Sequence, residues 1–598
     1  MKRWLLKRTK VNTAEMAKEL GIRQATATVL ANRELYSRKD ARDFLYGGED
    51  AFGDPAAMKD MLKGVSILAQ AIQNGKKIAV YGDYDVDGVM STSILYQTIL
   101  RCGGKAVFYV PHRQKEGYGL NLKAVEDLSA EEVEVLFTCD NGIAAVQEIA
   151  LAKEKGMMVV VLDHHEPGFA GTGEERRDLL PKADAIIDPK QRDCSYAFKH
   201  MCAGGLSYKF ARLLLQEFCI SDEELEKQLV SFAAIATICD IVDLLGENRA
   251  IVRKGLPEIQ KTENVGLRVL IEEAGLGDKG VTDYHIGFII GPCINATGRL
   301  ESGRQAVELF CSRNEKDARE KAKNLVQLNE ERKHLTEEAA VRADLSLQEG
   351  DALKDRVLVL YDPVIHESIA GIVAGRIKDK YYHPTILITG SEDGAKGSGR
   401  SIEGYHLFEA LFENRDLFTR FGGHAMAAGL SLPVENIDIL RNRLNEQCQL
   451  TDEEMIPVLR LDKSLSFAEI DLGLAKELKA LAPFGKGNPA PLFGSKGIRV
   501  DRLDLIGKEK NILRMTLSEP KSGTRLSAIS FDGYSQLMEM LRELYPEEDC
   551  GKMILSGQLP HLLDIVYSVD INTYHGRSNV QLMLKDFRFA KYGGQLWT

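Results

Sequence analysis

The chain has 598 residues, which is too many for one hydrophobic core, so three or four domains are expected. With 44% hydrophobic and 28% charged residues, the composition is that of an ordinary soluble globular protein, and it excludes collagen-like or disordered chains. No apolar run approaches a membrane span of roughly 18 residues, and the first residues lack the apolar core of a signal peptide. The ten cysteines form no Cys-x-x-Cys pair, which predicts reduced thiols in a cytoplasm rather than a disulfide framework or structural zinc.

The net charge of −11 sets a condition on any role in nucleic-acid binding. Affinity for a polyanion depends on a local basic groove rather than on the total charge. An acidic chain that binds DNA is therefore expected to do so through a narrow basic groove, with an acidic surface on the side away from the groove.

Residues 1–75 are predicted to be mostly helical. Helix periodicity runs from Thr13 to a glycine stop at Gly21, and Ser37 is a candidate cap for a second helix. The favoured interpretation is a packing cap on the catalytic domain, with a helix-turn-helix as the alternative.

The stretch 76–100 carries the most informative pattern. An apolar strand to Tyr81 leads into Gly82-Asp83-Tyr84-Asp85-Val86-Asp87-Gly88, and an amphipathic helix follows over 91–100. This order places three carboxylates at the carboxyl edge of a parallel sheet, where open α/β folds bind ligands. Close carboxylates repel one another, and a hard cation such as Mg²⁺ or Mn²⁺ relieves that repulsion. A plain polar turn and a calcium loop are alternatives, but an EF-hand needs a preceding helix, and the strand argues against one.

Similar clusters follow at three further predicted strand ends. They are Thr138-Cys139-Asp140-Asn141-Gly142, Leu162-Asp163-His164-His165 and Thr237-Ile238-Cys239-Asp240. Strands are predicted at 78–81, 106–110, 135–139, 158–162, 184–187 and 235–239, with helices between them, as in a parallel doubly wound sheet. Because parallel strand ends converge at one edge, the four clusters can meet, and they predict a two-metal site.

The remainder of the chain is predicted to form further domains. Residues 251–310 read as helical with a break at Gly291-Pro292, and 316–348 as one long charged helix connecting two lobes. A second α/β unit spans 355–432, with phosphate-binding loops expected at 397–401 and 422–424. The segment 455–598 predicts a small β-barrel from strands at 498–505, 511–517, 525–531, 552–558, 563–569 and 580–587. Tyr567 and Tyr574 are as compatible with core packing as with base stacking.

The motifs GDYDVDG, TCDNG and LDHH, with the Asp of TICD, resemble the four motifs of the DHH phosphoesterase superfamily. The segments PHRQKEGYGLN, GPCINATGRL, GSGRSIEG, FGGHAMAAGL and PFGKGNPAPLF are further similar to those of the RecJ family of bacterial exonucleases, from about residue 30 to the end. The resemblance implies an α/β fold class, in which a parallel-sheet DHH catalytic domain is joined by a long helix to a second α/β (DHH-associated) domain, followed by an OB-like β-barrel. The expected domains are 1–75 (cap), 76–310 (catalytic), 311–350 (connecting helix), 351–450 (DHH-associated) and 451–598 (OB-like).

The activity implied by the resemblance is exonuclease digestion of single-stranded DNA from 5′ to 3′ into mononucleotides, in DNA repair and recombination. Two Mn²⁺ or Mg²⁺ ions are the implied cofactors, with the ligands Asp83, Asp85, Asp87, Asp140, His164 and Asp240. Asp140 is the candidate to bridge the ions, Asp163 to orient the histidines, and His165 to meet the scissile phosphate. The implied contacts to DNA and its 5′ phosphate are Arg113, Tyr118, Asn295, Arg299, Ser398, Arg400 and His424.

One departure from the superfamily pattern concerns the second metal. Many members carry a histidine where this chain has Tyr81, and a phenol with a pKa of about 10 is a poor ligand for Mg²⁺ or Mn²⁺. Expected partners are single-stranded DNA and, as candidates, a single-strand-binding protein and a helicase, with no membrane and a monomeric state. Two rival interpretations remain: a hydrolase of pyrophosphate, cyclic dinucleotides or very short oligonucleotides, and a non-catalytic scaffold of the kind found in replication machinery.

Overall fold

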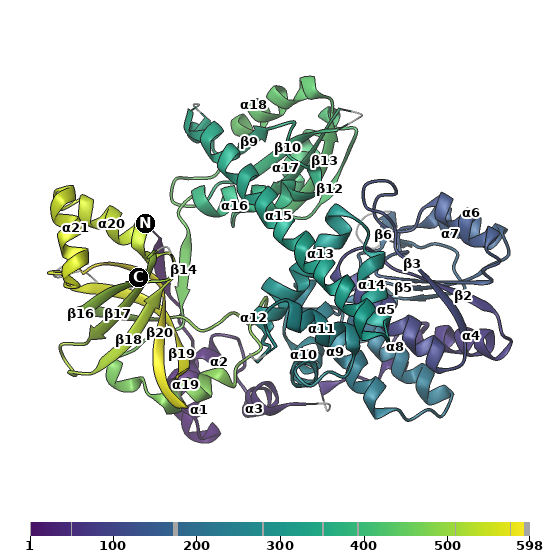
Figure 1. Ribbon diagram of the computed structural model, residues 1–598, viewed down its shortest axis with the longest axis horizontal. Helices are drawn as coiled ribbons and strands as arrows, with labels where there is room; N and C mark the ends of the chain where they lie inside the picture. Colours follow the sequence, from purple (N-terminus) through teal and green to yellow (C-terminus); the bar gives the residue numbers. More distant parts are fainter. Residues whose placement is uncertain are drawn as a thin grey trace. The chain divides into compact units, whose positions relative to one another are not determined.

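The structure is a computed structural model that describes residues 2–48, 51–170, 177–277, 280–349, 352–391, 394–508, 510–574 and 576–590. The chain divides into two compact units. One is the continuous segment Glu49–Ile456, and the other joins Met1–Gly48 to Pro457–Thr598 (Figure 1). Within the described ranges, no helix has both the length and the apolar character needed to cross a membrane.

The first part of the continuous unit is built on a five-stranded parallel sheet with the order β3-β2-β4-β5-β8. Its strands are β2 (Lys77–Tyr81), β3 (Lys105–Tyr109), β4 (Val135–Cys139), β5 (Met158–Leu162) and β8 (Ala185–Ile187). A small antiparallel pair, β6 (Gly168–Ala170) and β7 (Arg177–Leu179), lies between β5 and β8 in the chain. The first five strands predicted from the sequence coincide with the strands of the parallel sheet within a residue or two, and the α/β fold class is confirmed.

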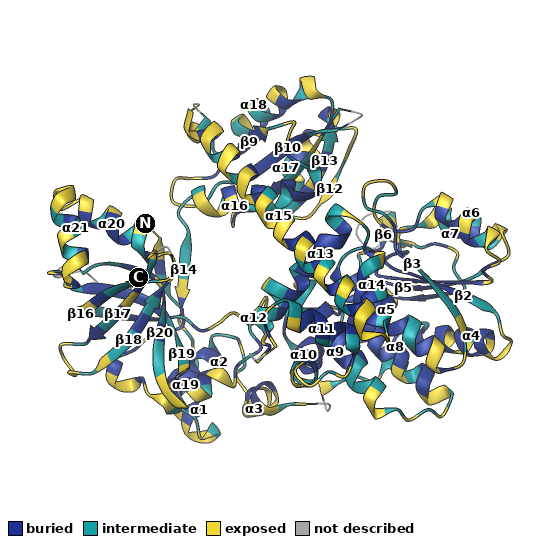
Figure 2. Ribbon diagram, viewed as in Figure 1, coloured by how far each residue is buried: buried dark blue, intermediate teal, exposed yellow. Residues whose placement is uncertain are grey.

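Helices cover both faces of this sheet. In β2, Ile78 and Val80 join one buried apolar cluster, while Ala79 and Tyr81 join another, as the two-residue period of a strand requires. The first cluster includes residues of α4 (Met61–Gln73), α5 (Val86–Arg101), α8 (Ala203–Glu217) and α9 (Glu223–Cys239). The second includes α6 (Leu122–Ala130) and α7 (Val146–Glu154). The sheet is therefore buried on both sides, which Figure 2 shows as dark strands between helices.

The strand predicted at 235–239 is wrong, because these residues form the last turns of α9. The run from Leu229 to Thr237 is buried throughout and packs among α5, α8 and α10 (Gly246–Ile259). A short, continuous apolar run fits a buried helix as well as a buried strand. Asp240 consequently lies directly after the end of a helix rather than after the end of a strand.

The helical segment that follows differs from the prediction at Gly291-Pro292. After α11 (Val265–Glu273), the chain runs through α12 (Asp283–His285), a π-helical turn η4 (Ile286–Ile290) and α13 (Gly291–Leu300) without a break. Proline lacks an N–H and crowds the preceding turn of an α-helix, and the wider π turn makes room for it. Helix α14 (Arg304–Cys311) then leads to α15 (Glu315–Glu349), the predicted long connector.

The second domain of this unit is a mixed sheet with the order β12-β13-β11-β10-β9. Its elements are β9 (Leu358–Tyr361), α16 (Glu367–Tyr381), β10 (Thr385–Ser391), β11 (Gly394–Arg400), α17 (Leu407–Glu413), β12 (Arg420–Gly423), β13 (Ala427–Leu432) and α18 (Ile437–Gln447). The loops expected at 397–401 and 422–424 are largely strands β11 and β12. At Gly399 an added Cβ would lie 2.6 Å from the Leu407 side chain, so the glycine serves close packing of a strand rather than a loop.

The other unit contains a closed β-barrel. Strands β16 (Phe493–Ile506), β17 (Ile512–Ser518), β18 (Arg525–Ser530), β20 (Arg577–Phe589) and β19 (Leu563–Tyr574) pair in this order, and β19 pairs back with β16. Short β15 (Lys463–Ser464) adds at the edge, and α19 (Leu472–Lys479) and α20 (Gly533–Arg542) pack on the barrel. The strand predicted at 552–558 is wrong: 547–556 form helix α21, where Cys550 and Ile554 are buried one turn apart. Tyr567 is buried and bonded to Ser495, so it is a core residue, whereas the Tyr574 side chain lies outside the described residues.

The cap predicted over 1–75 is divided between the two units: α4 packs on the catalytic sheet as expected, whereas residues up to Gly48 belong to the barrel unit. Strand β1 (Arg3–Leu6) pairs in parallel with β14 (Val458–Leu461), and the Trp4 indole N–H donates to Asp586 at 2.7 Å. Helices α1 (Thr13–Leu20), α2 (Gln24–Ala31) and α3 (Arg38–Tyr46) follow, and Arg23 and Thr26 bond to Glu477 of α19. Local periodicity identifies such helices but carries no information about which distant surface they cover.

Candidate active site

Acidic and histidine side chains from four segments gather at the carboxyl edge of the parallel sheet. Three groups have ligand-type atoms that all lie within 4.8 Å of one another: Asp83, Asp85 and Asp140; Asp87, His164 and Asp240; and Asp140, His164 and His165. Asp140 and His164 each belong to two groups. The convergence predicted from the sequence is therefore present, including Asp240, which arrives from the end of α9.

The turn after β2 fixes the first three carboxylates. Asp85 caps α5 by accepting the Gly88 N–H at 3.1 Å. An added Cβ at Gly88 would lie 2.5 Å from the Asp83 carbonyl oxygen, so only glycine lets the helix begin this close to the turn. The Asp87 carboxylate accepts the Ala203 and Gly204 N–H groups at 2.8 and 2.7 Å, at the start of α8. These amides orient Asp87 and stabilise its negative charge.

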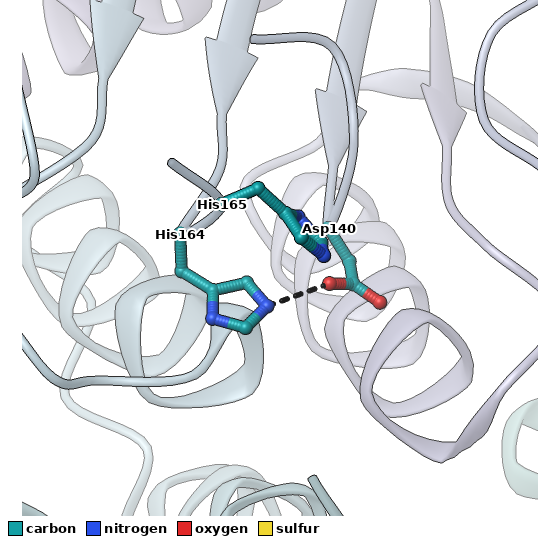
Figure 3. Close-up of side chains that lie close together, drawn as sticks. All are labelled: Asp140, His164 and His165. Atoms are coloured by element: carbon teal, nitrogen blue, oxygen red, sulfur yellow. Dashed lines mark hydrogen bonds and ion pairs between the residues drawn. The ribbon is translucent and has the colours of Figure 1, made fainter. Parts of the chain in front are cut away.

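Asp140 holds the central position. It has a left-handed backbone (φ 62°), a strained conformation that Asp tolerates better than most residues and that recurs at functional sites. One of its oxygens lies 3.1 Å from His164 Nε2, as Figure 3 shows together with the neighbouring His165 ring. Asp240 approaches the same imidazole from the other side, at 3.8 Å from Nδ1.

Asp163 does not face these carboxylates but holds the two histidines. Its Oδ1 accepts the backbone N–H groups of His164 and His165 and lies 2.7 Å from His165 Nδ1, while Oδ2 accepts the Ile143 N–H. His165 Nε2 lies 3.0 Å from the Tyr118 hydroxyl, which donates to the Asp140 carbonyl oxygen. Burial is the largest single influence on His165 and lowers its pKa, but the hydrogen bond to Asp163 and the negative charges of Asp163, Asp240 and Asp87 together raise the pKa to about 9. His165 is therefore positively charged at neutral pH.

The carboxylates disfavour one another's charge. Burial and the neighbouring carboxylates raise the pKa of Asp83 and Asp140 well above the ordinary value, that of Asp87 to about 7 and that of Asp240 to about 8. By contrast, burial and the charge of His165 lower the pKa of His164 to about 3, which leaves it neutral, the form that binds metals.

The donor set fits divalent cations. Asp83 is fully buried, and neither of its carboxylate oxygens has a hydrogen-bond partner of ordinary geometry in the part of the chain that the structure describes, although the Tyr84 and Gly119 amides lie close enough to lower its pKa. A buried carboxylate without a partner is costly, and a cation between Asp83 and its acidic neighbours would satisfy it. Oxygen donors with one or two imidazoles suit Mg²⁺ and Mn²⁺.

Tyr81 takes no part in these groups. Its hydroxyl donates to the Gly119 carbonyl at 3.0 Å, and its ring stacks on Tyr109 with the centroids 5.0 Å apart. Burial raises the phenol pKa further above its usual value, so the group stays protonated. Tyr81 is a packing residue under the Gly119 loop and leaves the donor set to the aspartates and histidines.

A pocket of about 260 Å³ opens beside the acidic groups. Its lining residues are Asp83, Tyr84, Asp85, Arg113, Tyr118, Asn295 and Arg299, which include four of the seven residues predicted to contact DNA. The Arg113 guanidinium lies over the Tyr84 ring, 5.4 Å from its centroid, which fixes its direction. Arg299 donates to the Ser368 carbonyl oxygen at 2.7 Å, where α16 begins.

Arginines concentrate around this pocket without acidic partners. Burial, together with the positive charges of Arg113, Arg332 and Arg400, lowers the pKa of Arg299 to about 10, so it remains charged. Among the residues that the structure describes, none of these four arginines forms an ion pair. Uncompensated guanidinium groups at a pocket mark a site for an anion such as phosphate.

The remaining three predicted residues do not line the pocket. Ser398 and Arg400 lie on β11, where the Arg400 guanidinium bonds to Ser398 Oγ and the Gly399 carbonyl oxygen. The charge of Arg400 nevertheless acts on Arg299, so this arginine lies near the cationic side of the pocket. His424 is exposed in the turn between β12 and β13.

Sequence reasoning missed several residues at the site. Tyr84 was visible inside the acidic motif but was not identified as a wall of the pocket, and the α8 amides that hold Asp87 carry no sequence signal. Asp188 is buried behind the histidines, where burial and the nearby Asp163 raise its pKa to about 8. Arg332, on the long helix α15, adds positive charge near Arg299. In the sequence it is one of many charged residues of that helix, and nothing there links it to the pocket.

The parallel sheet has helices on both faces and carries this cluster at its edge, and a long helix joins it to a second domain with a mixed sheet. Together these features define a phosphoesterase of the DHH superfamily. Family models agree: residues 77–237 match the DHH family, N-terminal domain; 354–450 match the DHHA1 domain; and 461–586 match the RecJ OB domain.

The chain is also similar to individual relatives. It is 35% identical to the single-stranded-DNA-specific exonuclease RecJ of Bacillus subtilis, over 99% of this chain and 71% of that protein. The crystal structure of RecJ in complex with Mn²⁺ from Thermus thermophilus superposes with a TM-score of 0.80 at 24% identity, covering 98% of this chain and 80% of that one. A crystal structure of exonuclease RecJ bound to manganese is 30% identical with a TM-score of 0.57, covering 66% and 96%. The chain belongs to the RecJ family.

Proposed function

We propose that this protein is a metal-dependent exonuclease that degrades single-stranded DNA from the 5′ end, releasing mononucleotides. The observation that carries the proposal is the position of two groups of metal-ligand side chains. Asp140 belongs to one group and lies next to His164 of the other, and the pocket lined by Arg113 and Arg299 opens directly beside them. Membership of the RecJ family and the manganese-bound relative support the same chemistry.

Two Mn²⁺ or Mg²⁺ ions, when bound, would neutralise charge on the attacked phosphate and activate a water. Asp83, Asp85 and Asp140 would hold one ion, and Asp87, His164 and Asp240 the other; Asp140 is the candidate to serve both because its carboxylate also lies beside His164. Backbone amides at the start of α8 hold the Asp87 carboxylate in position, and hydrogen bonds to Asp163 hold both histidines in place. These residues position the donors before substrate arrives, so little reorganisation accompanies the reaction.

His165 is the group that would meet the reacting phosphate. Its raised pKa keeps a proton on Nε2, on the side away from Asp163. From there it can stabilise negative charge on a phosphate oxygen or protonate the leaving oxygen. In the substrate-free arrangement the Tyr118 hydroxyl oxygen accepts a hydrogen bond from the His165 Nε2–H group and thereby holds the ring in position.

The pocket supports end recognition and mononucleotide release. A 5′ phosphate that occupies the space between Arg113 and Arg299 would sit next to the acidic groups, which would bring the first bonds of the strand to the reacting site. Asn295 and Tyr118 line the same space, and Ser398 and Arg400 are the candidates on the second domain. We assign these residues to binding of the strand end, with His424 as an outer contact.

Labelled oligonucleotides test the proposal. Single and double strands labelled at either end are digested with Mn²⁺, Mg²⁺ or chelator. The expected result is early release of a labelled mononucleotide from a 5′-labelled single strand, only with metal, and resistance of the duplex. The Asp140→Ala variant should be inactive with unchanged thermal unfolding. Cleavage of a circular single strand while a linear one remains intact would contradict end dependence, and full activity of Asp140→Ala would contradict the metal assignment.

A further inference from the structure

Two exposed aromatic rings stack on each other where the helical run 283–300 begins. Tyr284 and Phe288 have ring centroids 4.8 Å apart and an interplanar angle of 25°, and they are 61% and 67% exposed. Single exposed aromatics are ordinary on protein surfaces, but these two remain mostly exposed while stacked on each other, with the His285 ring meeting Tyr284 edge-to-face at a centroid distance of 5.9 Å. A stacked, uncovered pair offers a ready platform for another flat ring.

The exposed face that carries these rings leads to the pocket. Along 283–300, five of the non-buried positions, Tyr284, Phe288, Pro292, Asn295 and Arg299, recur at spacings of four, four, three and four residues. Within α13, Pro292, Asn295 and Arg299 lie within roughly a quarter of the helix circumference at 3.6 residues per turn, and Tyr284 and Phe288 precede them across the π turn. Asn295 and Arg299, at the far end of this stripe, line the pocket beside the acidic groups. Phe288 is seven residues from Asn295, or about 10 Å along the axis at 1.5 Å per residue.

The π-helical turn anchors the platform to the catalytic cluster. The Cys239 thiol, next to Asp240, lies 3.8 Å from the Ile286 carbonyl oxygen, and an added Cβ at Gly291 would lie 2.5 Å from the Cys239 sulfur. The turn that carries Phe288 is therefore packed tightly against the end of α9. Isolated π turns within helices are frequent at functional sites.

We propose that Tyr284 and Phe288 form a base-stacking platform for single-stranded DNA, a few nucleotides from the reacting end. The inference rests on the proposed function and adds a subsite to it. A strand whose terminal phosphate enters between Arg113 and Arg299 leaves the pocket along the stripe, where its bases reach the rings. Because every base has an aromatic face, such a platform holds the strand without sequence preference, as removal of successive nucleotides from any sequence requires. A docked protein is the other conceivable occupant, and the shared face with the pocket favours the strand.

The first test compares substrates that reach the platform with one that does not. Stacking of a base is worth a factor of about 5 to 150 in affinity. Y284A/F288A should therefore raise the KM for a long single strand by that factor and leave turnover of a dinucleotide unchanged. Tyr284→Phe and Phe288→Tyr keep the rings and should behave as wild type. Leu62→Ala removes a side chain of similar exposure (54%) on α4 and serves as the surface control.

A second test asks whether the rings contact bases. A pair of abasic nucleotides is moved stepwise from the 5′ end of the strand, which keeps every phosphate. Wild type should lose affinity at one window a few nucleotides from the end, and Y284A/F288A should show no such window. Identical abasic profiles for the two proteins, or equal KM values on the long strand, would overturn the platform. If wild type leaves single strands intact with either metal, the proposed function fails instead, so the two failures are distinguishable.

Discussion

Two glycines one turn apart on α16 offer a matched pair of perturbations at the cationic side of the pocket. A Cβ added at Gly371 would lie 2.6 Å from Arg400 Nη2 and 2.7 Å from Ser398 Oγ. At Gly375, an added Cβ meets nothing closer than Arg400 Cγ at 4.0 Å. Gly371→Ala must therefore push the Arg400 guanidinium aside by several tenths of an ångström, whereas Gly375→Ala fits the existing space.

The expected magnitudes separate stability from function. Replacing a helix-interior glycine by alanine stabilises by about 0.5–1 kcal/mol, and Gly375→Ala should show that gain. In Gly371→Ala the gain is offset by displacement of a flexible side chain, so the folding free energy should change little. A charge-assisted hydrogen bond from Arg400 to phosphate is worth about 1.5–3 kcal/mol, and its loss would lower kcat/KM about 10- to 150-fold.

The assay compares single strands with and without a 5′ phosphate. Wild type and Gly375→Ala should prefer the phosphorylated strand, and Gly371→Ala should lose most of that preference. Thermal unfolding of each variant checks that the fold is intact. If Gly371→Ala matches Gly375→Ala in both rate and preference, Arg400 is not a phosphate ligand in the position that the structure gives it.

Three further predictions follow from single contacts. Tyr81→Phe should cost about 1 kcal/mol, because the bond to the Gly119 carbonyl is lost, and should keep metal-dependent activity; a raised Mn²⁺ requirement would make Tyr81 a ligand. The pKa of Asp188 is raised to about 8 in the folded protein. Between about pH 4 and 8 the folded protein therefore binds a proton at Asp188, whereas the unfolded chain does not. The free energy of unfolding consequently falls as the pH rises through that range. Asp188→Asn should therefore flatten the fall in unfolding temperature from pH 5 to pH 8, and an unchanged slope would exclude this carboxyl as its cause. Trp4→Phe should destabilise the barrel unit by about 1–3 kcal/mol, because it leaves a buried Asp586 oxygen unpaired. Amide hydrogen exchange should show faster exchange in that unit, and faster exchange confined to the catalytic unit would contradict the assignment.

The parallel sheet was predictable because its strands are β-branched, apolar and bounded by polar turns. For the same reason, the acidic turn after β2, Asp140 and His164 could be expected to converge. Asp240 reaches the site as predicted but from a helix, since a buried apolar run does not distinguish the two structures.

Other features depend on contacts between distant segments. The α8 amides that hold Asp87, at positions 203 and 204, have no local signature. The same holds for β1, whose partner β14 lies more than 450 residues further along the chain. Glycine-rich β11 suggested a loop because glycine weakens strands in isolation, yet pairing on both edges and tight packing at Gly399 make it a strand.

The interleaving of the two ends of the chain has a consequence for synthesis. The catalytic unit is one uninterrupted segment, Glu49–Ile456, so all of its partners leave the ribosome in succession. Residues 2–48 are made before this unit, but the strand and helix surfaces that they cover are made after it, about 400 residues later. At about 5–20 residues per second this is a delay of roughly 20–80 s. We expect the nascent amino-terminal segment to need a chaperone during that interval, and the catalytic unit to mature well before the barrel.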